Sequence, residues 1–147
     1  MSPSLFTGAI LRGEPINVFN EGKMQRDFTY IDDIVEGVTR VLDKIPEKSS
    51  NFDTDHPDPA SSYAPYRVYN IGNNEPVQLM DFIQTIEAAV GREAEKNYMG
   101  MQNGDVVATY ANIDALTEAV GFKPSTPLKD GMEKFVSWYK EYHGYNN

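Results

Sequence analysis

The chain has 147 residues, 40% of them hydrophobic and 24% charged, which is enough for one globular domain with a hydrophobic core, expected over residues 1–147. The formal net charge of −9 argues against a nucleic-acid partner, because phosphate backbones are bound by concentrated Lys and Arg. The lack of cysteine excludes disulfides and thiolate sites and favours a cytoplasmic location, and no apolar run reaches the about 20 residues that a membrane span needs.

The first elements in chain order are a helix and two short strands. Residues Pro3 to Leu11 predict a helix, because Pro suits a first turn, apolar residues recur at helical spacing, and Gly13 ends the pattern. Residues Ile16 to Phe19 predict a strand, and a polar turn joins it to a second strand that begins at Arg26. We expect these two strands to form a small hairpin.

The second strand passes directly into a helix. Residues 26–31 alternate polar and bulky side chains, as a strand with one exposed face does. Asp32 is expected to cap a helix over residues 33–45. The apolar residues of this helix share one face: Val35, Val38, Val41, Leu42 and Ile45.

Arg26 stands at the beginning of this second strand, beside the turn. Its planar guanidinium can donate paired hydrogen bonds to the phosphate oxygens of a ligand held at the strand edge. The structural alternative is a surface ion pair with Glu21, Asp27 or Asp32. Spacing alone leaves both interpretations open.

The middle of the chain combines a long loop with a strand and a helix. Residues 46–65 are rich in Pro, Ser and Asp and lack periodicity, which predicts a long polar loop. His56 has acidic neighbours in this loop, but flexible polar loops commonly contain such residues, so no metal site is expected. Residues 66–72 predict a largely buried strand, and residues 79–90 predict a helix that Gly91 ends.

The last third of the chain predicts a strand, a turn and two helices. A strand is expected over residues 93–99 and a turn over 100–105. Asn112 is a plausible cap for a short helix over 113–120. A terminal helix begins at Pro127 and carries a broad apolar and aromatic stripe, which is typical of a core or interface.

Residues 22–36 read Gly-Lys-Met-Gln-Arg-Asp-Phe-Thr-Tyr-Ile-Asp-Asp-Ile-Val-Glu. This string resembles the signature of extended short-chain dehydrogenases/reductases of the NAD-dependent epimerase/dehydratase family that act on sugar nucleotides. Its nearest likeness is to the UDP-glucuronate 4-epimerases of polysaccharide biosynthesis, which residues 69–73 (Tyr-Asn-Ile-Gly-Asn) also resemble. The resemblance implies an α/β fold, namely the carboxy-terminal, substrate-binding part of that family, mainly helical with a small hairpin and a few short strands and without the Rossmann domain.

The resemblance also implies which residues bind a UDP-sugar. Arg26 matches the arginine that contacts the diphosphate, and Asp105 matches the aspartate that bonds the ribose hydroxyls. The strand from Asn17 to Phe19 matches the segment that holds uracil through main-chain groups. Gln102 stands where many relatives carry a phosphate-binding Arg and where UDP-glucuronate epimerases commonly carry Gln. The residues alone leave open a core role for Phe19 and a turn role for Asp105.

Family enzymes use bound NAD, which requires a glycine-rich turn after a strand and a Tyr followed four residues later by Lys. The sequence has no Gly-x-Gly and no Lys four residues after any Tyr. We therefore expect no catalytic, cofactor-binding or metal-binding residue in this chain, and NAD only in the complete enzyme.

The expected function is that of the sugar-nucleotide-binding portion of a UDP-glucuronate 4-epimerase-like protein. The complete enzyme interconverts UDP-glucuronate and UDP-galacturonate, and this chain alone is expected to be inactive. A dehydratase or decarboxylase is the alternative within the family. The non-catalytic alternative is a domain that self-associates as a homodimer or complements an NAD-binding domain in another chain. Both would cover apolar surface that a missing domain leaves exposed.

Overall fold

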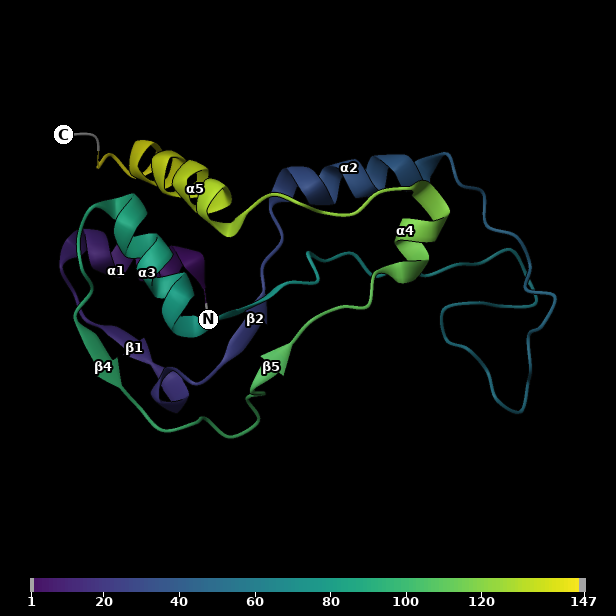
Figure 1. Ribbon diagram of the computed structural model, residues 1–147, viewed down its shortest axis with the longest axis horizontal. Coiled ribbons are helices and arrows are strands. Elements are labelled where there is room, and N and C mark those ends of the chain that lie inside the picture. Colours follow the sequence, from purple (N-terminus) through teal and green to yellow (C-terminus); the bar gives the residue numbers. More distant parts are fainter. Residues whose placement is uncertain (1, 146–147) are drawn as a thin grey trace. The chain divides into compact units, whose positions relative to one another are not determined.

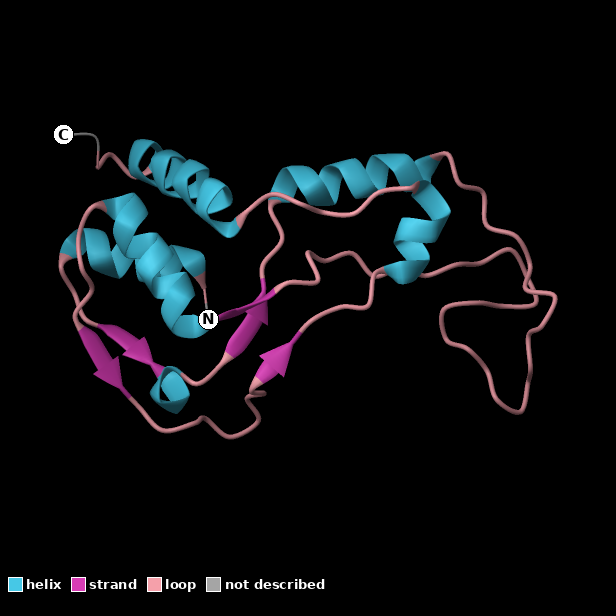
Figure 2. Cartoon of the chain, viewed as in Figure 1, coloured by secondary structure: helices cyan, strands magenta, loops and turns pink. Residues whose placement is uncertain are grey.

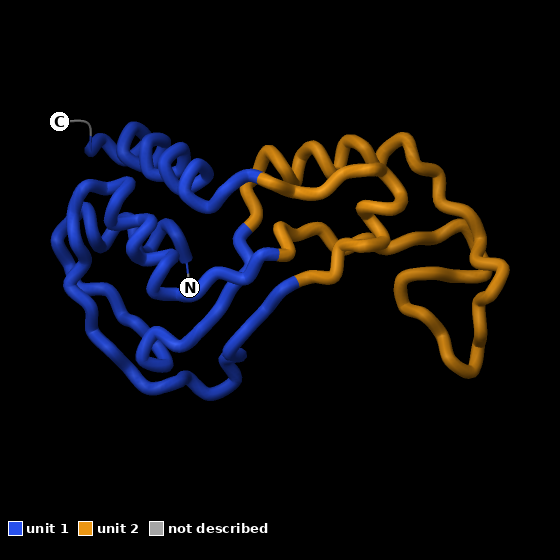
Figure 3. Tube along the Cα trace, in the orientation of Figure 1, with its two compact units in different colours: residues 1–28, 75–110, 126–147 blue, residues 29–74, 111–125 orange. Residues whose placement is uncertain are grey.

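The computed structural model describes residues 2–145, with the elements shown in Figures 1 and 2. The predicted α/β class, mainly helical with a few short strands, is confirmed. The chain divides into two compact units (Figure 3): residues 1–28, 75–110 and 126–147, and residues 29–74 and 111–125. No helix within residues 2–145 has the length and apolarity that crossing a membrane requires.

Three helices form the framework of the first unit: α1 (Pro3–Arg12), α3 (Leu79–Val90) and α5 (Leu128–Tyr142). Helices α1 and α3 end at Gly13 and Gly91, whose φ values of 75° and 83° are left-handed and therefore suit glycine. Helix α3 packs against both α1 and α5. The predictions of these three helices are confirmed.

The core of the first unit lies between these helices and strand β1 (Ile16–Val18). The helices contribute apolar residues at helical spacing, and β1 alternates buried, exposed and buried positions. The buried members of this core are Phe6, Ile10, Ile16, Val18, Met24, Leu79, Phe82, Ile83, Ile86, Met132 and Val136. This single apolar cluster holds the elements that surround the candidate site described below.

The strands of the first unit form two small sheets. Strand β1 pairs in parallel with β4 (Lys96–Tyr98). Strand β2 (Gln25–Asp27) lies between β3 (Pro76–Gln78), which is antiparallel to it, and β5 (Ala108–Thr109), which is parallel. Residue Arg26 therefore sits in the middle of a central strand.

The hairpin predicted from the first two strands is wrong, because β1 and β2 belong to different sheets. The 3-10 turn η1 (Phe19–Gly22) separates them. Asn20 and Glu21 in this turn have φ values of 50° and 51°, so the chain changes direction instead of folding back onto β1. The predicted strand over 26–31 is also shorter than expected and ends at Asp27.

The second unit contains helices α2 (Ile31–Leu42) and α4 (Asp114–Val120), which pack against each other. The predicted capping role of Asp32 is wrong, because α2 begins at Ile31, two residues before the predicted start, and Asp32 lies within its first turn. The predicted cap Asn112 lies one residue before the N-cap of α4, which is Ile113, but its Oδ1 still accepts a hydrogen bond from the amide of the first helical residue, Asp114, at 2.9 Å.

Residues 46–74 of the second unit contain no helix and only one isolated bridge, between Ser61 and Arg67. Residues 46–65, for which the sequence predicts a long loop, contain turns and bends but no helix and no named strand. The buried strand predicted over 66–72 is wrong, and Val68 is 45% exposed. Among the described residues no strand lies beside this segment, and a strand without a paired neighbour cannot satisfy its main-chain groups.

Candidate functional site

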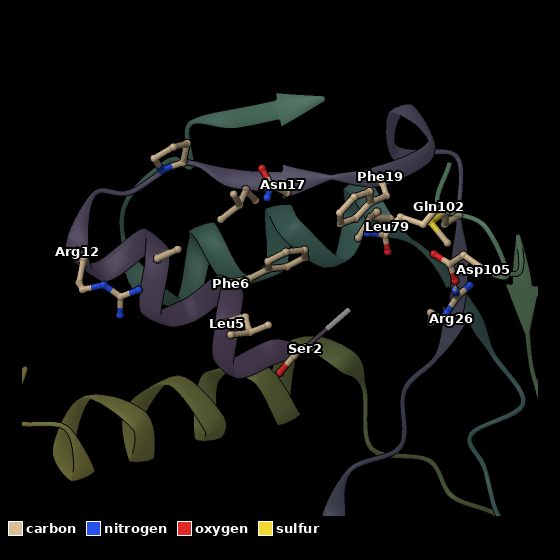
Figure 4. A pocket seen from close by; sticks show the side chains of 14 residues that line it. Ser2, Leu5, Phe6, Arg12, Asn17, Phe19, Arg26, Leu79, Gln102 and Asp105 are labelled. Atoms are coloured by element: carbon tan, nitrogen blue, oxygen red, sulfur yellow. Dashed lines mark hydrogen bonds and ion pairs between the residues drawn. The ribbon is translucent and has the colours of Figure 1, made fainter. Parts of the chain in front are cut away.

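A cavity of about 340 Å³ lies in the first unit, between α1, β1 and the turn that precedes β5 (Figure 4). All the residues that the sequence predicts for ligand binding line this cavity: Asn17, Phe19, Arg26, Gln102 and Asp105. They come from three segments that are up to 88 residues apart in the chain, from Asn17 to Asp105. The fold therefore brings the predicted set together in one place.

Arg26 is held at the cavity by three acceptors. Its Nη1 donates to the carbonyl oxygens of Gln25 at 2.7 Å and Val107 at 3.3 Å, and its Nη2 donates to Asp105 Oδ1 at 2.9 Å. The side chain is only 18% exposed. The carboxylate that Arg26 contacts is thus Asp105, across 79 residues of sequence, and not one of the three carboxylates near it in the chain.

Asp105 closes the turn before β5 and also faces the cavity. Its amide donates to the carbonyl of Gln102 at 3.2 Å, and its Oδ1 accepts from the Val106 amide at 3.0 Å as well as from Arg26. Both side-chain bonds are accepted by Oδ1, and Oδ2 of Asp105 takes no part in them. Asp105 thus has the turn role that the structural alternative predicts and also lines the cavity, where its binding to a ribose stays a prediction.

Strand β1 presents an open main-chain edge beside the cavity. Its hydrogen bonds to the β4 segment include those from Ile16 N to Glu95 O at 2.8 Å and from Met99 N to Val18 O at 2.9 Å. In a parallel pair only every second residue of a strand hydrogen-bonds to the neighbouring strand. Because Ile16 and Val18 bond to the β4 segment, the main-chain N–H and C=O of Asn17, which lies between them, face away from β4. In the described sheet β1 has β4 as its sole partner, which leaves these two groups available.

Phe19 and Gln102 complete the predicted set. Phe19 is half-buried, packs against the core and also forms part of the cavity wall, so both of its predicted roles are compatible with its position. Gln102 is exposed in the turn and lies near Asp105 and Arg26 in Figure 4. Its neutral amide offers donors for an anion without adding charge.

The predicted binding residues do not include the part of the cavity wall that α1 supplies. Figure 4 shows Arg12 at the opposite end of the cavity from Arg26. Arg12 donates from Nε and Nη2 to Glu14 Oε2 at 2.9 and 2.7 Å, and this bond lowers the pKa of Glu14 below its ordinary value. Leu5 also lines the cavity and is largely exposed, but in the sequence it does not differ from the other apolar residues of the same helical stripe, so no sequence signal marks this wall.

The described residues offer no group of three or more His, Asp or Glu side chains that could hold a metal ion. The chain contains no Gly-x-Gly, the kind of glycine-rich turn that binds a dinucleotide between a strand and a helix. Among the residues that line the cavity, Arg26 and Gln102 carry hydrogen-bond donors suited to an anion, and Asp105 carries an acceptor suited to a hydroxyl group.

Comparisons with known proteins give one matching family model, the NAD dependent epimerase/dehydratase family, over residues 3–72. The chain is 54% identical over 138 residues to Protein CapI of Staphylococcus aureus, covering 94% of this chain and 41% of that protein. It is 44% identical over 137 residues to the probable UDP-glucuronate 4-epimerase of Rhizobium meliloti, covering 92% of this chain and 40% of that protein.

Among solved structures, the chain resembles the UDP-glucuronic acid 4-epimerase of Bacillus cereus in complex with UDP-glucuronic acid and NAD. The TM-score is 0.76 at 26% identity, over 97% of this chain and 40% of that one. The chain thus spans about 40% of the length of the relatives it matches. The resemblance predicted from the sequence is confirmed.

Proposed function

We propose that this chain belongs to the NAD dependent epimerase/dehydratase family and binds a UDP-sugar in the cavity around Arg26. The ligand we infer is UDP-glucuronate, and the complete enzyme would interconvert it with UDP-galacturonate by means of NAD. The observation that carries the proposal is that the five residues implied by the resemblance line one cavity, although the chain carries them on three separate segments.

Each group has a role that its chemistry supports. Arg26 binds the diphosphate through the donors that its three protein acceptors leave over. Asp105 accepts hydrogen bonds from the ribose hydroxyls through Oδ2. Gln102 donates to the phosphate region without adding charge.

The base lies along β1 in this proposal. The open N–H and C=O of Asn17 match the carbonyl and N3–H of uracil, which needs one donor and one acceptor from the protein at this edge. The half-buried ring of Phe19 supplies an apolar surface for the base.

The proposal is tested by calorimetric titration of the chain with UDP and with UDP-glucuronate. Both should bind, and Arg26→Ala should lose on the order of 1.5–3 kcal/mol, the scale of a hydrogen bond to a charged group. Arg67→Ala is the matched control, because it removes the same charge from the second unit and should leave the affinity unchanged. No binding of either nucleotide by the unchanged chain would contradict the proposal.

We further propose that the chain does not epimerise UDP-glucuronate alone. The proton transfer at the sugar hydroxyl needs a Tyr with a Lys four residues later, and the sequence has no such pair. The test is incubation of the pure chain with NAD and UDP-glucuronate. Formation of UDP-galacturonate would overturn this statement while leaving the binding proposal intact.

A second candidate function is association with another chain through α2. One face of this helix is apolar but uncovered in the described part of the second unit: Val35 and Val38 are each 52% exposed and Leu42 is 75% exposed. A soluble protein rarely leaves such a patch without a partner. We propose an NAD-binding domain in a separate chain as the partner, since the matched relatives are more than twice as long as this chain.

Light scattering tests this second candidate. A mixture with the separately produced remainder of the Bacillus cereus UDP-glucuronic acid 4-epimerase, the part outside its match to this chain, should give a complex that Val38→Lys abolishes. If instead the chain alone forms a dimer that Val38→Lys dissociates, the face serves a homodimer. A chain that stays monomeric alone and in the mixture would contradict both forms of association.

A further inference from the structure

Two asparagines face each other across the parallel pair of β1 and β4. Asn17 and Asn97 are partners in the register, and Asn97 Nδ2 donates a hydrogen bond to Asn17 Oδ1 at 3.0 Å. Both side chains are exposed, whereas Ile16 and Val18 on either side of Asn17 are buried, so Asn17 lies on the face of β1 opposite the core. The core therefore holds the main chain of β1, and Asn97 holds the side chain of Asn17.

This hydrogen bond decides which end of the Asn17 amide is left over. A side-chain amide carries an acceptor oxygen and a donor NH2 group, and half a turn about its last bond exchanges the two. The bond from Asn97 requires that Oδ1 of Asn17 point toward β4. In the described part of the chain no protein group accepts a hydrogen bond from Nδ2 of Asn17. Since Asn17 lines the cavity (Figure 4), this donor is available to a ligand there.

A uracil beside β1 has one more hydrogen-bonding group than the main chain of Asn17 can satisfy. The pairing edge of uracil carries two carbonyl oxygens, O2 and O4, with N3–H between them. The open C=O and N–H of Asn17 can bond to N3–H and to O2, which leaves O4 in need of a donor. Cytosine differs at this position, because it carries an amino group in place of O4. A donor amide therefore suits uracil and an acceptor suits cytosine.

We infer that Asn97 sets the base preference of the cavity by turning the amide of Asn17, so that Nδ2 of Asn17 donates to O4 of a uracil. This inference rests on the proposed function and deepens it, because that function assigns only the main-chain groups of Asn17 to the base. Asn17 is then a binding residue through its side chain, and Asn97 is a positioning residue that does not touch the ligand. With the amide reversed, Oδ1 would face O4, and two acceptors would meet without a hydrogen between them.

The experiment is calorimetric titration of the unchanged chain, Asn97→Leu and Asn97→Asp with UDP and with CDP. The ratio of the two affinities is the measured quantity, since both ligands carry the same ribose and diphosphate. Asn97→Leu frees the amide of Asn17 and should lower the preference for UDP on the order of threefold to tenfold, the effect of one net hydrogen bond. Asn97→Asp offers only acceptors, which favour the reversed amide, and should lower the preference further.

The same two substitutions in an Asn17→Ala background test whether Asn97 acts through the Asn17 amide. In that background the ratio should not respond to residue 97, because the amide is absent and only the main-chain groups contact the base. A merely structural role of Asn97 would not give this pattern. Asn51→Asp makes the same change of charge at an exposed position of the second unit and should leave the ratio unchanged. Thermal unfolding of each variant shows whether it is folded.

The outcomes distinguish this inference from the proposed function. If the unchanged chain binds UDP but the ratio is the same in both Asn97 variants, the inference is overturned alone. If the ratio changes equally with and without the Asn17 amide, Asn97 acts on the strand and not through that amide, with the same consequence. If the unchanged chain binds neither nucleotide, the proposed function fails and the inference fails with it.

Discussion

Phe28 and Phe82 stack with their ring centroids 4.1 Å apart and their planes at 11°. Phe82 lies in α3 and is fully buried in the core of the first unit, and Phe28 follows directly after β2. Phe28 is two residues from Arg26, so this stack fixes the end of the strand that carries the candidate phosphate-binding residue. The position of Arg26 is therefore expected to depend on the packing of an aromatic pair whose first ring follows it by two residues.

Shortening either side chain of this pair should lower the free energy of unfolding. Phe82→Ala is expected to lower the free energy of unfolding by about 3–5 kcal/mol, because it leaves a cavity in a closely packed core. Phe28→Leu keeps an apolar side chain but loses the stacking, which is worth about 0.5–1.5 kcal/mol. Urea denaturation measures both values. Ile45→Ala, at a position that is 87% exposed, should change stability by less than about 0.5 kcal/mol, and an equal loss there would contradict the packing argument.

The ion pair between Glu87 of α3 and Lys96 of β4 should contribute to the stability of the fold. Glu87 Oε1 accepts from Lys96 Nζ at 2.5 Å and from the Ala94 amide at 2.8 Å, and the Glu87 side chain is mostly buried. Glu87→Gln keeps an acceptor but leaves Lys96 without its counter-charge, so we expect a loss of about 1–3 kcal/mol in unfolding free energy. The exposed pair of Lys23 with Glu21 is the control, and Glu21→Gln should have no measurable effect.

Gly37 should be sterically coupled to Ile71. A Cβ at position 37 would lie 2.3 Å from Ile71 Cδ1, although Gly37 is in the interior of α2, where Ala is favoured over Gly by about 1 kcal/mol. We expect Gly37→Ala to be neutral or destabilising in the unchanged chain and stabilising in the Ile71→Val background, which lacks Cδ1. A double-mutant cycle measures the coupling, expected to be about 1 kcal/mol. Additive effects would contradict the close approach.

The helices were predictable because their signals are local. In α3, apolar residues recur at helical spacing over three turns, and Gly91 supplies the left-handed residue that ends the helix. The strand partners were not predictable in the same way. β1 and β4 have three residues each and are paired across 80 positions, Ile16 with Lys96, so neither length nor alternation identifies the partner.

In the candidate site, too, the local patterns were predictable from the sequence, whereas the contact between distant residues was not. The motif around Arg26 and the turn at Asp105 were recognisable as separate patterns, because each is a short string of characteristic residues. The bond between them was not, since spacing suggested Glu21, Asp27 or Asp32 as the partner of Arg26 and the chain instead brings Asp105 to it through the parallel pairing of β2 with β5. Such a contact follows from tertiary structure and has no local signature.

Asp58 should titrate below its ordinary range. Its Oδ1 accepts from the Ala60 amide at 2.9 Å, and this hydrogen bond, followed by one from the Ser61 side chain, lowers the pKa of the carboxyl because both favour its charged form. Arg67, at 3.9 Å, contributes less. Since the pKa is lower in the folded chain than in the unfolded one, the resulting stabilisation is complete above the unfolded pKa and is lost as the pH falls through the folded pKa.

Carboxyl-carbon NMR titration of Asp58 tests this ranking of causes. The midpoint should lie below the ordinary value of an Asp in the unchanged chain, and Arg67→Ala should retain most of the shift, because the hydrogen bond from the main chain dominates it. Ser61→Ala should recover more of the ordinary value than Arg67→Ala does. If Arg67→Ala alone abolished the shift, the ion pair at 3.9 Å would be the main cause, and the turn at Asp58 to Ser61 would hold the carboxylate less firmly than its hydrogen bonds indicate.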